Sequence, residues 1–281
     1  MKLLRFGKYG QEKPGCLDPQ GMVRDLSSII SDIDGTTLSS EGLAALSAVD
    51  LNSLPIVDSS IRIGACVGSV GNFIAVGLNY VDHARETGSA IPAEPILFNK
   101  HTSCIAGPND PVTIPRGSVK TDWEAEIAFV ISKAAFEVSA EEAMGYIAGF
   151  CVSHDVSERA FQSERGGQWT KGKSSPSFGP LGPWLVTTNE IEDVQNLDVW
   201  LDVNGKRMQA GSTSNMIFPI AYLVSYISTF MRLLPGDVVT TGTPAGVGLG
   251  RKPQVFLKAG DVVELGVQSL GTQRQVFCAV N

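Results

Sequence analysis

Apolar residues are arranged along most of this chain in short runs that glycine, proline and small polar residues interrupt. Residues 73–80, 126–132 and 146–156 are three such runs with few polar breaks. Short apolar runs between turn residues are typical of buried strands, and the first of these runs leads into a helix start. Residues 236–242 and 260–267 repeat the pattern, so we expect the chain to end in further strands.

Two other patterns predict a hairpin and a helix. In residues 197–209 the pair Asn204-Gly205 lies between two alternating segments, and this pair suits a type I′ turn between antiparallel strands. Residues 216–231 form the longest helical candidate. Pro219 is tolerated in such a helix only if it lies in the first turn.

Before residue 69 the pattern is different, with short strands, polar turns and one weak helical patch at residues 41–48. We therefore expect a small β-rich N-terminal domain over residues 1–68 and a larger domain over residues 69–281. Strands outnumber helices in the larger part and do not alternate regularly with them. This arrangement predicts an α+β fold with a rolled or barrel-like core rather than a doubly wound sheet.

Composition narrows the class of protein. Hydrophobic residues make up 43% and charged residues 18% of the 281 positions, as expected for a packed globular protein. The formal net charge of −7 argues against binding to nucleic acid or to an anionic membrane, because both require an excess of basic residues. No apolar run approaches the ~20 residues that span a bilayer, and the first residues lack the long apolar core of a signal peptide.

The five cysteines are scattered along the chain without a C-x-x-C pair. An odd number of widely spaced cysteines fits reduced thiols better than a disulfide framework or a zinc site. We therefore expect a cytoplasmic protein.

A group of acidic residues lies in an otherwise apolar part of the chain. In a strand, Asp122, Glu124 and Glu126 would share one side. Three neighbouring acids repel each other, so a positive charge is expected in front of them. A solvated strand face is the plain alternative. The apolar flanks instead favour a buried position, where carboxylates must be paired or bound to a metal ion.

Asp155 adds a fourth acid where the apolar run 146–156 ends. A hard divalent cation bound by oxygen atoms would satisfy such a cluster. Magnesium takes a few carboxylates and keeps water ligands, whereas an all-carboxylate site disfavours zinc and copper. The sequence therefore predicts a magnesium-type site near these acids.

His83 and Glu86 are three residues apart, so on a helix they lie on one face. A carboxylate beside an imidazole orients the ring and raises its basicity, which is the usual arrangement of a general base that activates water. A surface pair without a catalytic role is the alternative.

Two motifs point to other functions. Residues 31–38, SDIDGTTL, resemble the nucleophile loop of haloacid-dehalogenase-type phosphatases, but the strand before them is weak and no paired acidic motif follows. A polar turn is the alternative there. Residues 246–250, GVGLG, follow a strand as a dinucleotide-binding loop would. Their spacing is not G-x-G-x-x-G, so a turn that presents backbone N–H groups to some ligand is the better interpretation.

Seven motifs in a fixed order carry a resemblance to a known family. They are VGLNYVDHARETG, DWEAEIAFVIS, HDVSERAFQ, WTKGKS, GPLGPWLVT, NGKRMQAGST and TTGTPAGVGLG. In order and spacing, from about residue 73 to the carboxyl terminus, the chain resembles the fumarylacetoacetate hydrolase family. The segment before these motifs resembles the small extra domain of many members. The resemblance implies a mixed β-roll that usually forms a homodimer.

The resemblance also implies roles for particular residues. The E-x-E motif matches the family's metal pair, and the ligands it implies for Mg²⁺ or Mn²⁺ are Glu124, Glu126 and Asp155. The catalytic residues that it implies are His83 and Glu86 as the water-activating pair and Lys173 near the substrate's carbonyl and carboxylate oxygens. Substrate contacts are implied for Tyr80, Arg159, Gln162 and Thr243. Asp122 matches no ligand and would either support the site from behind or face solvent, and Lys171 has no assigned role.

The reaction that the resemblance implies is cleavage of a carbon–carbon bond next to a 2-oxo acid. His83 would take a proton from water, which attacks the distal carbonyl of a β-diketone, and Lys173 would stabilise an oxyanion or fix a carboxylate. The helix around residues 80–90, bounded by Gly77 and Gly88, is expected to act as a lid.

Residues 171–218 are most similar to members that act on 2,4-dioxo-3-deoxy sugar acids of the fuconate and rhamnonate pathways, with pyruvate and lactate as products. A ureidoglycolate lyase, an acylpyruvate hydrolase, an oxaloacetate decarboxylase and a hydratase or isomerase of aromatic breakdown remain alternatives. The metal site is common to all of these activities and does not choose between them. The expected partner is a small 2-oxo or 2,4-dioxo acid.

Overall fold

The computed structural model describes residues 1–280. The α-helices are α1 (Ser40–Ser47), α2 (Val81–Thr87), α3 (Arg159–Ser163), α4 (Thr170–Lys173) and α5 (Ile220–Phe230). The strands are β1 (Lys2–Phe6), β2 (Lys13–Leu17), β3 (Val23–Asp25), β4 (Phe73–Gly77), β5 (Ile96–Lys100), β6 (Ile105–Ala106), β7 (Val112–Ile114), β8 (Thr121–Asp122), β9 (Ala125–Ile131), β10 (Ile147–His154), β11 (Ser157–Glu158), β12 (Gly179–Thr187), β13 (Asp198–Val203), β14 (Lys206–Ser212), β15 (Val238–Thr240), β16 (Val262–Val267) and β17 (Gly271–Ala279).

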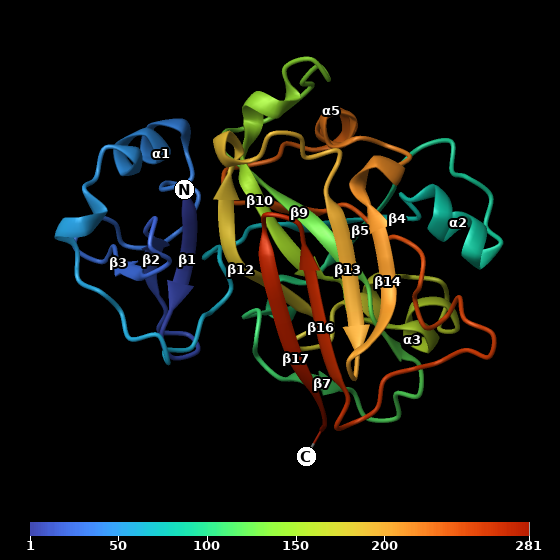
Figure 1. The fold of residues 1–281 in the computed structure, drawn as a ribbon. Helices are drawn as coiled ribbons and strands as arrows, with labels where there is room; N and C mark the ends of the chain where they lie inside the picture. Colours follow the sequence, from blue (N-terminus) through green and yellow to red (C-terminus); the bar gives the residue numbers. More distant parts are fainter. Residues whose placement is uncertain (281) are drawn as a thin grey trace.

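Two large sheets form the body of the molecule (Figure 1). The first has the strand order β3-β2-β1-β12-β10-β9-β15-β4-β5, with β6 paired to β12. The second has the order β14-β13-β16-β17-β7. Most neighbours are antiparallel, but β15 and β4 are parallel. Every residue of β9 and of β10 is buried, as expected for apolar strands covered on both faces.

The first sheet curls on itself. A Cβ added to Gly179 of β12 would lie 2.8 Å from the ring of Phe73 in β4, although three strands separate β12 from β4 in the sheet order. The second sheet packs against the first, and Gln273 of β17 donates to the carbonyl of Val152 in β10 at 2.9 Å. This confirms the predicted α+β fold with a mixed β-roll.

The hairpin prediction is confirmed, and the helix predicted over residues 216–231 is found over Ile220–Phe230, so it begins after Pro219. Asn204 and Gly205 join β13 to β14 with φ angles of 50° and 75°, and a type I′ turn requires positive φ at both positions. Pro219 immediately precedes the first residue of α5 and caps the helix, where its missing N–H costs no hydrogen bond. Helix α1 coincides with the weak helical patch, and its N-cap is Ser39.

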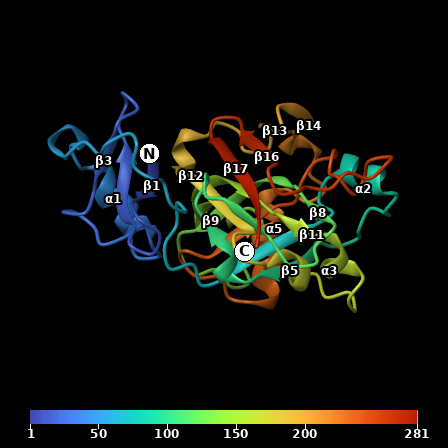
Figure 2. The same ribbon diagram turned by 90° about the horizontal axis from the view of Figure 1, so that it is seen from below.

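The N-terminal segment lies to one side of the roll in two views (Figures 1 and 2). Its strand β1 pairs with β12 and so extends the first sheet. The domain boundary at residue 68 stays a prediction. Within residues 1–280 no helix is long and apolar enough to cross a membrane. All five cysteines are free thiols.

The SDIDGTTL segment is a turn, which confirms the plainer of the two interpretations. Both oxygens of Asp32 are bound by Arg5, at 2.6 Å and 3.1 Å. The backbone carbonyl of Asp32 accepts a hydrogen bond from the hydroxyl of Thr37 at 2.7 Å. Asp32 is thus occupied by a structural ion pair and is not available as a nucleophile.

Candidate functional site

A cavity of about 210 Å³ opens where the ends of β4, β9, β10 and β15 meet. Its lining contains most of the predicted site residues: His83, Glu124, Glu126, Asp155, Arg159, Gln162, Lys173 and Thr243. These residues come from sequence positions up to 160 apart, and the curled sheet brings them together.

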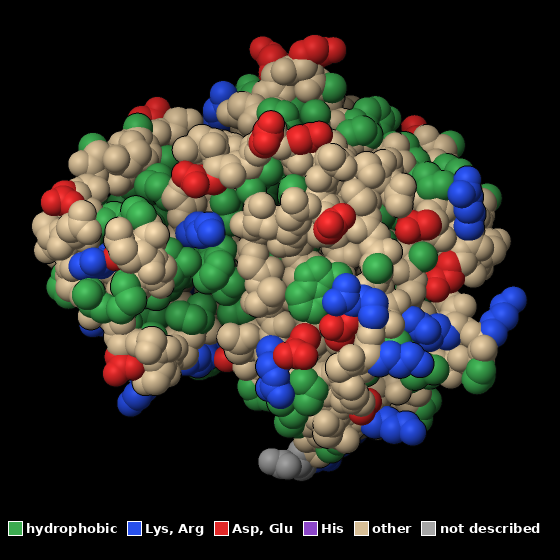
Figure 3. Space-filling model, in the orientation of Figure 1, with side chains coloured by type: hydrophobic (Ala, Val, Ile, Leu, Met, Phe, Trp, Pro, Cys, Tyr) green, Lys and Arg blue, Asp and Glu red, His purple; other side chains and the backbone are tan. Residues whose placement is uncertain are grey.

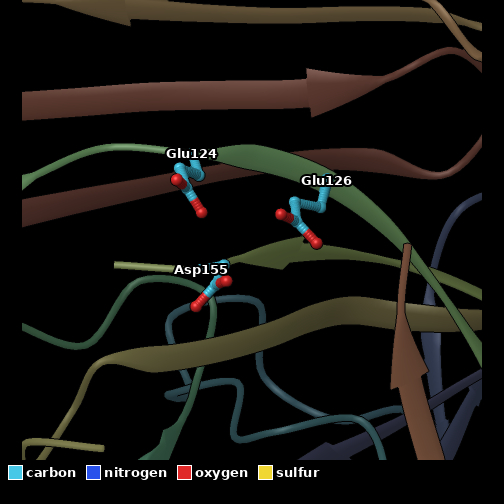
Figure 4. Close-up of side chains that lie close together, drawn as sticks. All are labelled: Glu124, Glu126 and Asp155. Carbon is cyan, nitrogen blue, oxygen red and sulfur yellow. The ribbon is translucent and has the colours of Figure 1, made fainter. Parts of the chain in front are cut away.

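Three of the four predicted acids converge (Figure 4). Glu124 precedes β9, Glu126 lies in β9, and Asp155 follows β10. One oxygen from each of these residues lies within 4.8 Å of the others. The backbone N–H of Asp155 donates to the carbonyl of Glu124 at 3.0 Å, which fixes the two strand ends against each other. The spacing suits one cation held by oxygen atoms.

Lys173 supplies positive charge in front of two of these acids. Its Nζ lies 2.5 Å from Oε2 of Glu124 and 2.7 Å from Oδ2 of Asp155. Burial acts to raise the pKa of Glu124, but the charges of Lys173 and Arg159 outweigh it and hold that pKa below its usual value. Glu124 is therefore ionised.

Glu126 has no such partner. Its Oε2 accepts hydrogen bonds from the hydroxyl of Thr240 at 2.5 Å and from the N–H of Gly242 at 2.9 Å, but no ion pair reaches it within the described residues. Burial raises the pKa of Glu126 well above its usual value, and the charges of Asp155 and Glu124 raise it further. A buried carboxylate in this position favours either a proton or a metal ion. The donor set therefore fits a hard divalent cation.

The His83–Glu86 pair lies on α2, with Nδ1 of His83 at 3.5 Å from Oε2 of Glu86. Gly246 donates its N–H to both oxygens of Glu86, at 3.0 Å and 2.9 Å. Although burial acts to raise it, these bonds and the bond from His83 hold the pKa of Glu86 below its usual value. Because Nδ1 faces Glu86, Nε2 is the ring nitrogen left to exchange a proton with a ligand or water.

Arg159 lies at the start of α3 and is almost fully buried. It binds Asp122 through Nε at 2.8 Å, and its Nη1 lies 2.8 Å from Glu124 and 3.2 Å from the side-chain oxygen of Gln162. Its Nη2 is buried without a hydrogen-bond partner in the described residues. A buried unpartnered guanidinium nitrogen beside a cavity is suited to an anionic ligand.

The other two predicted substrate contacts are placed differently. The hydroxyl of Thr243 donates to the carbonyl of Ala125 at 2.8 Å and accepts from Gln209 at 2.8 Å. Tyr80 is fully buried and does not line the cavity, and its hydroxyl has no hydrogen-bond partner within residues 1–280. Substrate contact by either residue stays a prediction.

Asp122 does not join the acidic cluster. It has no exposed surface and binds Arg159, so it supports the site from behind and does not face solvent. The chain leaves strand conformation between β8 and β9, and this break removes Asp122 from the face that Glu124 and Glu126 share. Lys171 is exposed and donates to the carbonyl of Arg165 at 2.7 Å, outside the cavity.

Lys100 is a site residue that sequence reasoning missed. It is fully buried, and its Nζ lies 2.6 Å from Oδ1 of Asp155 and 2.5 Å from the carbonyl oxygen of Lys173. The only signal in the sequence is a lysine that ends an apolar strand. Trp169 was also missed. Its ring packs edge-on against Phe98 at 5.3 Å and covers Gly77.

The GVGLG loop presents its N–H groups to the protein itself. Gly246 donates to Glu86, and Gly248 and Leu249 donate to Asp122 at 2.7 Å and 2.9 Å. The expectation that these groups face a ligand is therefore wrong. The loop is occupied by two internal carboxylates.

Known proteins are similar to this chain in sequence and in fold. A model of the family described as fumarylacetoacetate (FAA) hydrolase, C-terminal, matches residues 72–278. Proteins of Burkholderia lata and Burkholderia cenocepacia, each named "Putative hydrolase", are 57% identical to this chain over 276 residues, which are 98% of this chain and 98% of each relative.

Two solved structures are similar over nearly their whole length. Fumarylacetoacetate hydrolase from Exiguobacterium antarcticum is 32% identical with a TM-score of 0.89, and the match covers 100% of both chains. A 2-hydroxyhepta-2,4-diene-1,7-dioate isomerase from Mycobacterium marinum is 29% identical with a TM-score of 0.75, over 99% of this chain and 98% of that one. Because the family model spans most of the chain and the fold agrees throughout, the chain belongs to the fumarylacetoacetate hydrolase family.

Proposed function

We propose that this chain is a divalent-metal-dependent hydrolase that cleaves a carbon–carbon bond in a small 2,4-dioxo acid. The observation that carries the proposal is Glu126, a buried carboxylate without a cation, which converges with Glu124 and Asp155 on a cavity. The same cavity is lined by His83 and by Arg159, which offers a free N–H group.

Glu124, Glu126 and Asp155 would hold the metal ion, Mg²⁺ or Mn²⁺. When bound, a divalent ion supplies Lewis-acid polarisation of carbonyl and carboxylate oxygens and neutralises charge. The remaining steps belong to side chains of the protein.

His83 acts as the general base. Its Nδ1 is oriented by Glu86, so Nε2 takes a proton from water as the water oxygen attacks the distal carbonyl carbon of the β-diketone. The bond between that carbon and the central methylene carbon then breaks. The electron pair leaves with the 2-oxo acid fragment as an enolate, which takes up a proton to give pyruvate. The other fragment leaves as a carboxylic acid.

Lys173 and Arg159 act on the charged end of the substrate. The ammonium of Lys173 lies between Glu124 and Asp155, where it can stabilise an oxyanion or fix a carboxylate. The free Nη2 of Arg159 can donate to the same carboxylate. On the surface, lysine and arginine side chains gather on the side of the molecule where α2 and α3 lie (Figures 1 and 3), although the net charge is −7. This field would draw an anion towards the cavity.

For the substrate we propose a 2,4-dioxo-3-deoxy acid of a 6-deoxy sugar, fuconate or rhamnonate, which gives pyruvate and lactate. The cavity of about 210 Å³ is smaller than the roughly 300–1,000 Å³ of drug-sized pockets, so it suits a short substrate. Its wall combines the hydroxyls of Thr87 and Ser89 with the apolar surfaces of Phe98 and Trp169. Such a wall offers partners to hydroxyl groups and to a terminal methyl group.

A panel of substrates tests the proposal. The protein is freed of metal with EDTA, reloaded with Mg²⁺ or Mn²⁺, and offered 2,4-dioxo sugar acids, acylpyruvates, oxaloacetate and ureidoglycolate. We expect loss of the β-diketone absorbance with the sugar acids, with pyruvate and lactate formed in equal amounts. Glu124→Gln and Asp155→Asn should abolish this turnover. Turnover that persists in EDTA or in these variants would overturn the metal assignment. A preference for another substrate in the panel would overturn the substrate assignment.

A further inference from the structure

Asp122 is a buried carboxylate that the proposed mechanism does not use. Its Oδ2 accepts hydrogen bonds from Nε of Arg159 at 2.8 Å and from the N–H of Leu249 at 2.9 Å. Its Oδ1 accepts from the N–H of Gly248 at 2.7 Å. One carboxylate thus joins the arginine on the cavity wall to the loop 246–250.

The other end of the same loop holds the histidine pair. Gly246 donates its N–H to both oxygens of Glu86, and Glu86 orients His83. Trp123, the residue after Asp122, donates its indole N–H to the carbonyl of Gly246 at 3.0 Å. The Asp122-Trp123 pair is therefore bonded to both ends of the loop.

The glycines of this loop make these contacts possible. A Cβ on Gly250 would lie 2.4 Å from Cδ of Glu86, and a Cβ on Gly248 would lie 2.6 Å from Oδ1 of Asp122. Gly246 has a φ of +111°, which residues with a Cβ rarely adopt. The backbone can approach both carboxylates closely only because these positions lack side chains.

We propose that Asp122 is a positioning residue that keeps Arg159 and the His83–Glu86 pair in fixed relative positions through the loop 246–250. Its catalytic meaning rests on the proposed function, whereas the contacts themselves do not. No hydrogen bond or ion pair joins Asp122 to His83 or Glu86 in the part of the chain that the structure describes. The hydrogen bonds that lead from Asp122 to Glu86 and on to His83 run through the loop, because Gly248 and Leu249 bind Asp122 and Gly246 binds Glu86.

The test reads the His83 ring directly. The chain has three histidines, so a protein labelled with ¹³C and ¹⁵N at histidine gives few ring signals, and His83→Gln assigns that of His83. We expect Asp122→Asn to shift the His83 ring signals because the loop releases Glu86. The matched control is Asp237→Asn, since Asp237 is also buried and accepts backbone N–H bonds, from Asn72 and Leu234, but lies outside the cavity. This control should leave the His83 signals unchanged.

Unchanged His83 signals in folded Asp122→Asn would overturn the proposal. If that variant does not fold, Asp122→Glu, which keeps the carboxylate but displaces it from the N–H groups of Gly248 and Leu249, is read in the same way. In turnover assays Asp122→Asn should raise KM and lower kcat together, each by about tenfold, a loss of about 1.4 kcal/mol apiece. A rise in KM with kcat unchanged would show that Asp122 positions Arg159 alone and not the His83–Glu86 pair. This result would also overturn the proposal. Absence of turnover with every substrate would contradict the proposed function and leave the NMR result intact.

Discussion

Of the carboxylates that line the cavity, Glu126 is bound only by a hydroxyl and a backbone N–H, whereas Glu124 and Asp155 are paired with lysine and arginine side chains. Its raised pKa means that the folded, metal-free protein binds a proton more tightly than the unfolded chain, for which the usual value is 4.5. Metal-free stability should therefore fall as the pH rises above about 4.5.

We predict that Glu126→Gln removes both this pH dependence and the response to metal. In EDTA at pH 7 the variant should melt at or above the wild-type Tm, because a buried charge site is gone. Wild type should gain about 2.7 kcal/mol when Mg²⁺ or Mn²⁺ is present at a hundred times its Kd. The variant should gain almost nothing, as measured by thermal unfolding. Glu141→Gln, at an exposed position, is the control and should behave as wild type. A metal response retained in Glu126→Gln would disprove its role as a ligand.

Lys100 is predicted to be a structural cation of the site. Lys100→Met keeps most of the side-chain volume but leaves Asp155 with only Lys173 as a cation. Breaking a buried ion pair from one side costs about 3 kcal/mol or more, which urea unfolding would measure. Lys120→Met removes a half-exposed pair with Glu164 and should cost less than about 1 kcal/mol. Equal losses in the two variants would contradict this role.

At the scale of elements, α2 is held to the body of the molecule through Glu86. Because its pKa is lowered, Glu86 contributes stability above the usual value of 4.5, and this contribution is lost as the pH falls through the lowered pKa. Glu86→Gln should therefore reduce the free energy of unfolding at pH 7 by about 1–2 kcal/mol, which is the worth of a hydrogen bond to a charged group lowered for its partial exposure to solvent. The difference from wild type should shrink below about pH 4.5. Denaturant unfolding at a series of pH values measures it, and a difference that stays constant down to pH 3 would refute the assignment.

The end of β4 packs closely against the start of α4, where Gly77 contacts the ring of Trp169. A Cβ on Gly77 would lie 2.3 Å from the ring of Trp169, so Gly77→Ala must displace the ring from the cavity wall. Such overpacking typically costs about 1–3 kcal/mol of stability. We predict a loss in that range, with kcat/KM lowered about tenfold because α4 also carries Lys173. Gly145→Ala is the control, since its Cβ would meet only Nζ of Lys133 at 4.0 Å. Wild-type kinetics in Gly77→Ala would show that the wall does not contact substrate.

At the scale of the whole molecule, the homodimer that the family resemblance implies stays a prediction. One exposed apolar feature gives it a physical basis. Along α5 the rings of Tyr222, Tyr226 and Phe230 pack in succession, and Tyr222 and Phe230 are 40% and 62% exposed. Exposed apolar patches of this kind mark contact surfaces. Sedimentation should give twice the 29.9 kDa of one chain, and Phe230→Glu should shift it towards the monomer. A wild-type monomer would contradict the prediction.

The local features of this protein could be derived from the sequence. The buried strands, the turn at Asn204-Gly205 and the position of Pro219 before α5 depend on neighbouring residues alone. So does the placement of His83 and Glu86 on one helical face. Order and spacing of motifs also sufficed to pick out eight of the residues that line the cavity, whereas the predicted Tyr80 and Glu86 do not line it and Trp169 was missed.

Other features were decided only by the tertiary structure. Lys100 meets Asp155, and the glycine loop after β15 meets Asp122 and Glu86, across sequence separations of 55 to 160 residues. No periodicity or spacing reports such contacts, because they arise when a sheet curls and its distant strands meet. The curl of the sheet decides which cation lies beside each buried carboxylate. Glu126 is the carboxylate of the cluster without a cation, and this could be recognised only once the partners of Glu124 and Asp155 were known.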